Sequence, residues 1–213
     1  MSAFPIILSA PSGGGKTTIA KALLSRRDDL GYSVSCTTRT PRAGEVSGHD
    51  YYFMSRAEFI GERESRGFAE SAEVHGNLYG TRRSEVKRVL ASGKHVVMDI
   101  DVQGAAQFVR VFPDTVTIFI LPPSAEVLLE RLRGRKTESA AQLAARLQSA
   151  LQELQQLDEY EYVIVNDDLE RAIASVEAII DAEIVSRERV KNLRDQVGLL
   201  IQRLEQEIEN TTP

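Results

Sequence analysis

A glycine-rich run near the start of the chain constrains the fold more than any other feature. Residues 9–18 read Ser-Ala-Pro-Ser-Gly-Gly-Gly-Lys-Thr-Thr, between a short apolar segment and a segment of helical character. Glycines at such a junction let backbone N–H groups turn inward around phosphate oxygens, and the following helix adds its positive dipole end. The run therefore predicts a phosphate-binding loop, in which Lys16 reaches the β- and γ-phosphates and the Thr17 hydroxyl binds Mg²⁺.

The loop departs from the usual spacing at its first glycine, which is Ala10 here, so the turn at this position must be one that alanine can adopt. The alternative is a glycine-rich turn before a helix that holds no ligand. A phosphate-binding loop indicates a nucleoside triphosphate but no reaction, and it leaves kinases, GTPases, ATPases and transporters open. The residues expected to bind ATP here are Ala10, Pro11, Ser12, Gly13, Gly14, Gly15, Lys16, Thr17 and Thr18.

Short apolar runs rich in valine and isoleucine alternate with segments of helical character. The runs predict buried strands at residues 6–9, 96–100, 115–121 and 162–165, with a further strand at 32–35. Helices are expected at residues 16–25 and 86–90, after a capping box formed by Ser55 and Glu58, and after Ser124. This alternation predicts an α/β fold like that of P-loop NTPases, with a parallel sheet and helices on both faces.

Two polar stretches interrupt the alternation and predict additions to the core. The expected core comprises residues 1–34, 94–132 and 159–185, with an inserted subdomain at about 35–93 and a lid at about 133–158. The segment from 186 to 213 carries Val190, Leu193, Val197, Leu200 and Leu204 at spacings of three and four, which is a short heptad pattern. That helix either packs on its own domain or pairs with a second subunit, as in a homo-oligomer.

Composition excludes several classes of protein. The net charge is −5 and the pI about 5.4, which disfavours non-specific binding to nucleic acid or membranes, so a polyanionic substrate needs a local basic cluster. The single cysteine, Cys36, cannot form an internal disulfide. The first residues lack a signal peptide pattern, and no apolar run approaches the roughly 20 residues of a membrane span. We therefore expect a cytoplasmic protein.

A basic turn follows the predicted strand at 32–35. Arg39 and Arg42 flank Pro41, and two guanidinium groups on a stiff turn suit the dianion of a phosphate monoester. The hydroxyl groups of Tyr51 and Tyr79 could add donors to the same phosphate. The turn therefore predicts an acceptor substrate that carries a single phosphate group.

Together, these motifs resemble those of the guanylate kinase family. The match is a series in order over roughly residues 4–185. It comprises the phosphate-binding loop, Ser-Cys-Thr-Thr-Arg-Thr-Pro-Arg at 35–42 with Gly-Glu at 44–45, Glu70, Gly-Asn-Leu-Tyr-Gly at 76–80, Asp-Ile-Asp-Val-Gln-Gly at 99–104, and Val-Asn-Asp-Asp at 165–168. The resemblance implies ATP as phosphoryl donor, GMP as acceptor and Mg²⁺ as cofactor. The residues it implies for GMP are Ser35, Arg39, Arg42, Glu45, Tyr51, Glu70, Tyr79, Thr81 and Asp99.

The resemblance places Glu70, Thr81 and Asp99 near the guanine base, and the chemistry of the base supports this placement. Guanine presents donors at N1 and N2, where adenine presents an acceptor at N1, so carboxylates at these positions can accept from guanine and repel adenine. Asp101 follows the same predicted strand, at the edge where ligands bind, and is expected to join Thr17 at Mg²⁺. The alternative for Asp101 is that it only caps a turn.

The lid carries arginines that the resemblance places over the ATP phosphates. These are Arg131, Arg135 and Arg146, of which Arg135 and Arg146 are expected to be catalytic together with Lys16 and Arg39. The family's Gly-Arg-Gly pattern reads Gly-Arg-Lys at 134–136 here. A solvated basic face is the alternative for this run. Asn166 is suggested for the ATP site.

The implied reaction is the direct in-line transfer of a phosphoryl group from ATP to GMP, and to dGMP, giving GDP. Three alternatives stay open from the residues. A guanylate-kinase-like module that binds proteins and catalyses nothing is disfavoured by the retained Lys16 and Thr17. A kinase of another nucleotide is disfavoured by the guanine-facing carboxylates, and a GTPase by the lack of an Asn-Lys-x-Asp motif.

Overall fold

The computed structural model describes residues 2–74, 76–133, 140–190 and 192–211. Residues 3–176 form one compact unit, and residue 2 with residues 177–211 belongs to another.

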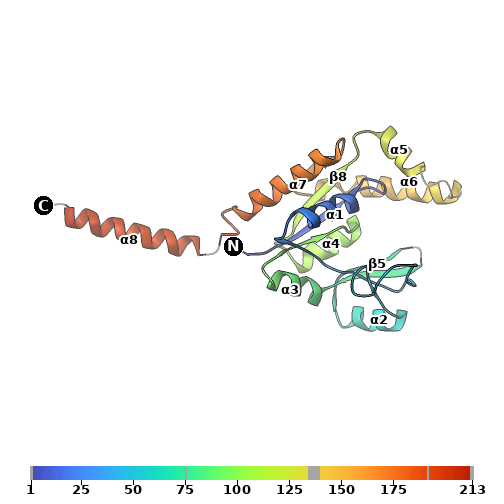
Figure 1. Ribbon diagram of the computed structural model, residues 1–213, viewed down its shortest axis with the longest axis horizontal. Helices are drawn as coiled ribbons and strands as arrows, with labels where there is room; N and C mark the ends of the chain where they lie inside the picture. Colours follow the sequence, from blue (N-terminus) through green and yellow to red (C-terminus); the bar gives the residue numbers. More distant parts are fainter. Residues whose placement is uncertain (1, 75, 134–139, 191, 212–213) are drawn as a thin grey trace. The chain divides into compact units, whose positions relative to one another are not determined.

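The first unit is built on a parallel sheet (Figure 1). Its strands, in spatial order, are β2 (Leu30–Tyr32), β7 (His95–Met98), β1 (Pro5–Ser9), β8 (Val116–Leu121) and β9 (Tyr162–Val165). Each neighbouring pair is parallel, for example Ile6 beside Val97 and Val116. The side chains of β1, β7 and β8 are almost entirely buried, because the sheet is covered on both faces.

Helices connect the parallel strands. They are α1 (Lys16–Arg26), α3 (Arg83–Ala91), α4 (Val102–Val111) and α7 (Leu169–Ile184), which continues into the second unit. Val86, Val89 and Phe108, from α3 and α4, pack against Ile7 and Met98 of the sheet. The α/β prediction with a parallel sheet is therefore confirmed.

Two predicted strand boundaries are wrong. The strand expected at 32–35 ends at Tyr32, because the chain then leaves the sheet and the Ser35 carbonyl accepts the Tyr52 N–H of a second sheet at 2.9 Å. The strand expected to reach residue 100 ends at Met98. Asp99 and Asp101 therefore lie beyond the carboxyl edge of the sheet, where ligands bind in folds of this kind.

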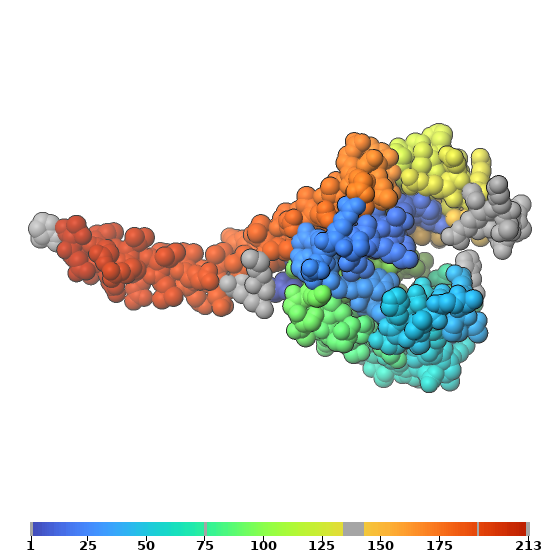
Figure 2. Space-filling view, viewed as in Figure 1, coloured from blue at the N-terminus to red at the C-terminus, as the bar shows by residue number. Residues whose placement is uncertain are grey.

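The second sheet forms a smaller layer within the first unit. It contains β4 (Tyr52–Phe53), β3 (Cys36–Thr37), β6 (Asn77–Arg82) and β5 (Phe68–Val74) in that order, with α2 (Arg56–Glu64) packed on it. The space-filling view shows these cyan segments gathered into one lobe (Figure 2). The predicted capping box begins α2: the Ser55 hydroxyl accepts the Glu58 N–H, and the Glu58 carboxylate accepts the Ser55 N–H.

The region predicted as an inserted subdomain, 35–93, extends past this lobe. Its last helix, α3, packs Val86 and Val89 into the core of the parallel sheet and not into the second sheet. We propose that the inserted subdomain ends with β6.

Two helices occupy the predicted lid region and its approach. These are α5 (Ala125–Arg133) and α6 (Ala140–Leu154), followed by a short 3₁₀ turn at Leu157–Glu159. The Ser124 hydroxyl accepts the Val127 N–H at 3.3 Å, as the predicted cap requires. Leu128 and Leu132 of α5 pack against Ala150 of α6, so the two helices share an apolar contact.

The second unit contains the end of α7 and the separate helix α8 (Leu193–Thr211). In the segment that follows α7, Arg189 forms an ion pair with Glu183 of that helix at 2.8 Å. No residue of α8 is buried among those described. Across the described parts of the chain, no helix combines the length and apolar character needed to cross a membrane.

Candidate active site

The phosphate-binding loop has a backbone that only glycine can adopt at two positions. Gly13 and Gly15 have φ angles of 86° and 98°, in the left-handed region. The Gly14 N–H donates to the Pro11 carbonyl at 2.7 Å, which closes the turn. A Cβ atom on Gly14 would lie 2.6 Å from that of Ala10. The loop therefore requires its glycines, whereas the small side chain of the buried Ala10 fits the position where the usual pattern has glycine.

Asn166 supports this loop from the end of β9. Its side chain is buried, and its Nδ2 atom donates to the Gly14 carbonyl at 3.0 Å. A Cβ atom on Gly15 would lie 2.6 Å from the same Nδ2 atom, so the asparagine packs directly beneath the loop. This contact gives Asn166 a role in holding the loop that requires no contact with adenine.

Thr17 meets Asp99 at the start of α1. The Thr17 hydroxyl donates to Asp99 Oδ2 at 2.6 Å, and the Tyr32 hydroxyl donates to Asp99 Oδ1 at 3.1 Å. Burial, followed by the nearby Asp99 carboxylate, raises the pKa of Tyr32, so its hydroxyl stays protonated and remains a donor. Both oxygens of Asp99 are thus oriented by neutral donors, and the carboxylate is fixed beside the Thr17 hydroxyl.

Asp101 belongs to a different cluster. Its carboxylate accepts the Gly104 N–H at 2.8 Å and caps α4, which confirms the capping interaction that the sequence left as an alternative. A Cβ atom on Gly104 would lie 3.1 Å from Glu70 Oε2 and 3.5 Å from Asp101 Oδ1. The two carboxyl groups therefore approach the same side of Gly104.

Glu70 is buried in this cluster on β5. The hydroxyl of the fully buried Thr81, on the paired strand β6, donates to Glu70 Oε1 at 2.6 Å. Burial raises the pKa of Glu70 to about 7, and the Asp101 carboxylate adds to the effect, while the Thr81 hydroxyl opposes it. Among the described residues no ion pair is found for the Glu70 carboxyl group. A ligand that donates hydrogen bonds to this group would replace the hydrogen bonds to water that burial removes.

Asp99 and Asp101 have different neighbours from those expected from the sequence. Thr17 is in contact with Asp99 and not with Asp101, whereas Asp101 lies with Glu70. The contacts therefore do not reproduce the expected pairing of Thr17 with Asp101 and of Asp99 with Glu70, and the metal and guanine roles of the two aspartates stay predictions. The physical reason is the turn after β7, which sends Asp99 toward α1 and places Asp101 at the start of α4.

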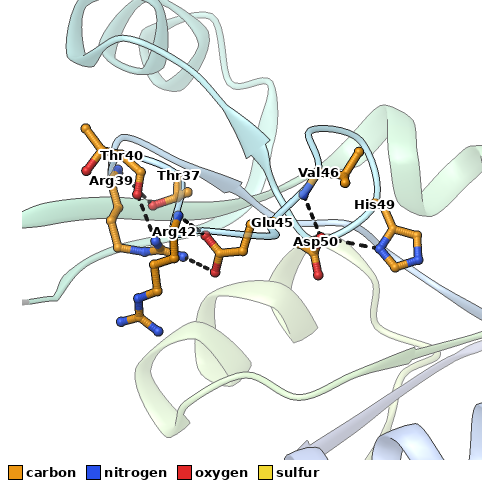
Figure 3. Close-up of polar contacts among 8 residues, drawn as sticks. All are labelled: Thr37, Arg39, Thr40, Arg42, Glu45, Val46, His49 and Asp50. Atoms are coloured by element: carbon orange, nitrogen blue, oxygen red, sulfur yellow. Dashed lines mark hydrogen bonds and ion pairs between the residues drawn. The ribbon is translucent and has the colours of Figure 1, made fainter.

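The basic turn between β3 and β4 is held by Glu45 (Figure 3). Arg39 donates to Glu45 Oε1 at 2.8 Å, and the Arg42 N–H donates to Glu45 Oε2 at 2.7 Å. The Arg39 N–H also donates to the hydroxyl of the buried Thr37 at 3.1 Å. Glu45 thereby raises the pKa of Arg39, and Arg39 lowers that of Glu45. Glu45 is thus a brace for the turn, while the Arg42 guanidinium extends away from it in the figure.

Aromatic rings complete this part of the site. The Arg39 guanidinium lies over Tyr51 and Phe53, at 5.4 and 5.8 Å from the ring centroids. Tyr51 and Tyr79 meet edge to face with centroids 6.0 Å apart. Burial, with Tyr79 nearby, raises the pKa of Tyr51 and keeps its hydroxyl a donor. The residues predicted to bind the phosphate, Arg39, Tyr51 and Tyr79, therefore lie together in the structure. Ser35 directly precedes β3 of the same lobe.

The lid region reaches the phosphate-binding loop through α6. Arg146 donates to the Leu132 carbonyl at 2.8 Å and to the Ser12 hydroxyl at 3.4 Å. A Cβ atom on Gly13 would lie 3.3 Å from the Cβ of Arg131, so the start of that arginine's side chain adjoins the loop. Arg131 and Arg146 therefore lie beside the phosphate-binding loop, whereas Arg135 and Lys136 fall outside the described residues.

Sequence reasoning missed two residues that contact this site. The Ser12 N–H donates to Glu153 Oε2 at 2.9 Å, and burial raises the pKa of that carboxyl group. Glu153 follows Arg146 by two helical turns, so helical spacing could have placed both on one face of α6. Tyr32 is the other. It ends β2 beside Val97 of β7, and no local sequence pattern indicates that its hydroxyl reaches Asp99.

Comparison with known proteins identifies the family. The family model described as guanylate kinase matches residues 2–183. The chain belongs to the guanylate kinase family. A guanylate kinase from Caldanaerobacter subterraneus subsp. tengcongensis is 46% identical over 188 residues, which cover 88% of this chain and 91% of the relative. One from Paramagnetospirillum magneticum is 47% identical over 196 residues, 92% of each chain.

A solved structure supports the fold as well. The crystal structure of guanylate kinase from Anaplasma phagocytophilum superposes with a TM-score of 0.74 at 36% identity, and the match covers 91% of this chain and 93% of that one. The predicted membership of the guanylate kinase family, its α/β fold class and its assignment as a kinase are confirmed. The alternative of a non-catalytic guanylate-kinase-like module gains no support from these relatives.

Proposed function

We propose that this chain catalyses ATP-dependent phosphorylation of GMP to GDP, and of dGMP, by direct in-line transfer. The observation that carries the proposal is the presence, within one unit, of a phosphate-binding loop and of a cluster of acceptor groups formed by Glu70, Thr81 and Asp101. The loop suits a triphosphate, and the cluster suits a base that donates hydrogen bonds. The names of the relatives support the same donor and acceptor classes.

Guanine suits this cluster of acceptor groups because the base presents donors at N1 and N2. We infer that Glu70 and Asp101 accept these hydrogen bonds and that the Thr81 hydroxyl fixes the Glu70 carboxylate. Adenine would set its N1 acceptor against the same buried oxygens and leave them unpaired, which is costly. The phosphate of GMP would be held by Arg39, Arg42, Tyr51 and Tyr79, with Ser35 at the start of this segment and Glu45 as the brace.

No general base is required in this proposal. The attacking oxygen belongs to a phosphate monoester, which is largely ionised near pH 7 because its second pKa is about 6. Rate acceleration then comes from positioning and from charge stabilisation by Lys16, Arg131, Arg135 and Arg146. Closure of the lid over ATP would exclude water and suppress hydrolysis.

Mg²⁺ fits the residues at the start of α1. Thr17 and Asp99 present a hydroxyl and a carboxylate in contact, which are the oxygen donors that this ion prefers. We propose that these two residues hold Mg²⁺ directly or through its waters, and that Tyr32 orients Asp99. When bound, the ion would neutralise charge on the β- and γ-phosphates of ATP.

We also propose that the protein acts in the cytoplasm on small-molecule substrates. A location in the cytoplasm is consistent with the single buried Cys36, which has no disulfide partner in the chain. The acidic net charge of −5 supports small-molecule substrates over nucleic acid.

The acceptor is tested by measuring ADP formation from Mg-ATP with no acceptor and with GMP, dGMP and AMP. We expect turnover with GMP and dGMP, little with AMP, and a loss of at least about a hundredfold in Lys16→Ala, because one charge-stabilising group is removed. Equal turnover with AMP would contradict the acceptor, and folded protein inactive with GMP would favour the non-catalytic module.

The separate roles of the two aspartates need a second pair of variants. Asp99→Asn should raise the Mg²⁺ concentration needed for half-maximal activity and leave the KM for GMP nearly unchanged. Asp101→Asn should raise the KM for GMP and leave the Mg²⁺ dependence unchanged, after circular dichroism has shown that α4 survives the loss of its charged cap. The opposite pattern would return the roles to those expected from sequence.

A further inference from the structure

Helix α4 holds strand β5 through the side-chain amide of Gln107. The Ser71 N–H of β5 donates to Gln107 Oε1 at 3.2 Å, and Gln107 Nε2 donates to the Ser71 carbonyl, also at 3.2 Å. Only one orientation of the amide satisfies both hydrogen bonds, because its oxygen must meet the N–H and its nitrogen must meet the carbonyl. The amide therefore binds Ser71 with one donor and one acceptor, as the backbone of a neighbouring strand would.

Ser71 lies at the edge of the second sheet. β5 stands at one end of the strand order and pairs with β6. Because both polar backbone groups of Ser71 are bonded to Gln107, they point away from β6. Gln107 Nε2 also donates to the Gln103 carbonyl at 3.4 Å, which ties the side chain to its own helix. The two hydrogen bonds to Ser71, called the Gln107 clamp below, thus join α4 to the edge of this sheet.

The same face of α4 approaches Glu70. Asp101 at the N-cap, Gly104 and Gln107 recur every three residues, which places them on one side of the helix. A Cβ atom on Gly104 would lie 3.1 Å from Glu70 Oε2, so glycine lets the helix come close to this carboxyl group. One helix face therefore carries the Asp101 carboxylate, the close approach to Glu70 and the Gln107 clamp.

Glu70 is held on β5 between two contacts with α4. Ser71, which follows it, is bound by the Gln107 clamp. Ala69, which precedes it, is buried in the apolar core that also contains Phe108 of α4. The backbone of Glu70 is therefore fixed to the helix on both sides, by apolar packing before it and by hydrogen bonds after it.

We propose that Gln107 is a positioning residue for selection of the base: it fixes β5 on α4, so that the Glu70 and Asp101 carboxyl groups keep one separation. The inference rests on the proposed function, in which these two groups accept hydrogen bonds from guanine. Groups that recognise a ligand must be held to within about 0.5 Å. A neutral amide achieves this without adding a positive charge beside the carboxyl groups, so their need for hydrogen-bond donors is left to the base.

The role is tested by steady-state kinetics of Gln107→Met, which keeps the length of the side chain and removes both hydrogen bonds to Ser71. We expect the KM for GMP to rise about tenfold, and the ratio of kcat/KM for GMP to kcat/KM for AMP to fall about tenfold, because Glu70 is less precisely placed. The KM for ATP and the kcat at saturating GMP should stay within about twofold of the wild type, since the phosphate-binding loop is untouched.

Arg56→Met is the matched control. Arg56, on α2, contacts the Glu73 carboxylate at 3.3 Å and the Gly76 carbonyl at 3.4 Å, so its replacement also removes polar contacts with the lobe. Glu73 lies three residues beyond Glu70 on β5, and the control should leave the KM for GMP and the selectivity near wild-type values. Unchanged selectivity in Gln107→Met, or an equal loss in Arg56→Met, would overturn the positioning role. A folded wild type without GMP-dependent turnover would instead overturn the proposed function, on which the role rests.

Two further measurements test whether Gln107 acts through Glu70. In a Glu70→Gln background, Gln107→Met should change the KM for GMP by less than about twofold, because the group that it positions is already altered. A further tenfold rise there would show that Gln107 acts independently of Glu70 and would refute the inference. In the nucleotide-free wild type, the Ser71 N–H should exchange slowly with solvent, although it lies on an edge strand. Rapid exchange at Ser71 would contradict the Gln107 clamp, whatever the stability of the variants.

Discussion

The buried Glu70 should make the nucleotide-free protein less stable as the pH rises. Its carboxyl group has a pKa of about 7 in the folded chain, against an ordinary value of 4.5, mainly because burial penalises the charged form. Below pH 4.5 the group is protonated in both the folded and the unfolded chain. Between pH 4.5 and 7 the unfolded chain ionises first, so the unfolded state is favoured progressively and folded-state stability is lost.

The size of the effect follows from the difference between the two pKa values. Each pKa unit is worth about 1.4 kcal/mol, so the full loss amounts to about 3 kcal/mol, and most of this loss falls between pH 5 and pH 8. Glu70→Gln removes the ionisable group but keeps an oxygen that can accept the Thr81 hydroxyl. Relative to this variant, the wild type should therefore become less stable by about that amount over the interval.

The assay is urea unfolding of nucleotide-free protein at half-unit steps from pH 5 to pH 8. Glu64→Gln on α2 is the matched control, because Glu64 is exposed and its replacement should leave the pH dependence unchanged. Saturating GMP should flatten the wild-type curve, since guanine would stabilise the charged carboxylate. Parallel stability curves for the wild type and Glu70→Gln would refute the reasoning.

Further predictions concern residues around the phosphate-binding loop. Tyr32→Phe removes a donor to Asp99, so the Mg²⁺ concentration for half-maximal turnover should rise about tenfold; an unchanged Mg²⁺ titration would contradict this. Asn166→Ala leaves the buried Gly14 carbonyl without its donor, so the free energy of unfolding should fall by about 1–3 kcal/mol in urea titrations, and no loss would exclude that support. Glu153→Gln keeps an acceptor for the Ser12 N–H but removes negative charge beside the loop, so calorimetry should show tighter ATP binding, and weaker binding would count against it.

Local chemistry explains what could be predicted from the sequence. The glycines of the phosphate-binding loop, the Ser55 capping box and the buried strands depend on neighbouring residues, so spacing and composition were sufficient to predict them. The cluster of Arg39 with Tyr51 and Tyr79 was expected because those residues belong to one motif series and one lobe. The brace that Glu45 supplies is also local, since it spans only the turn.

The different contacts made by Asp99 and Asp101 could not be predicted in that way. The two residues are neighbours in sequence, and which of them meets Thr17 depends on how the chain turns from β7 into α4. Glu153 and Tyr32 were missed for a related reason, because each contacts a segment distant in sequence. The surface that α8 packs against lies outside the helix itself. Its heptad pattern therefore could not decide between packing on its own domain and pairing with a second subunit.

Transfer of the γ-phosphoryl group from ATP to GMP is tested most directly with ATP that carries radioactive phosphorus in that group. With Mg²⁺ and GMP present, chromatography should show the label in GDP, and with AMP in place of GMP the label should remain in ATP. Label released as inorganic phosphate with no labelled GDP would contradict phosphoryl transfer to GMP, and label in ADP would contradict the selection of guanine.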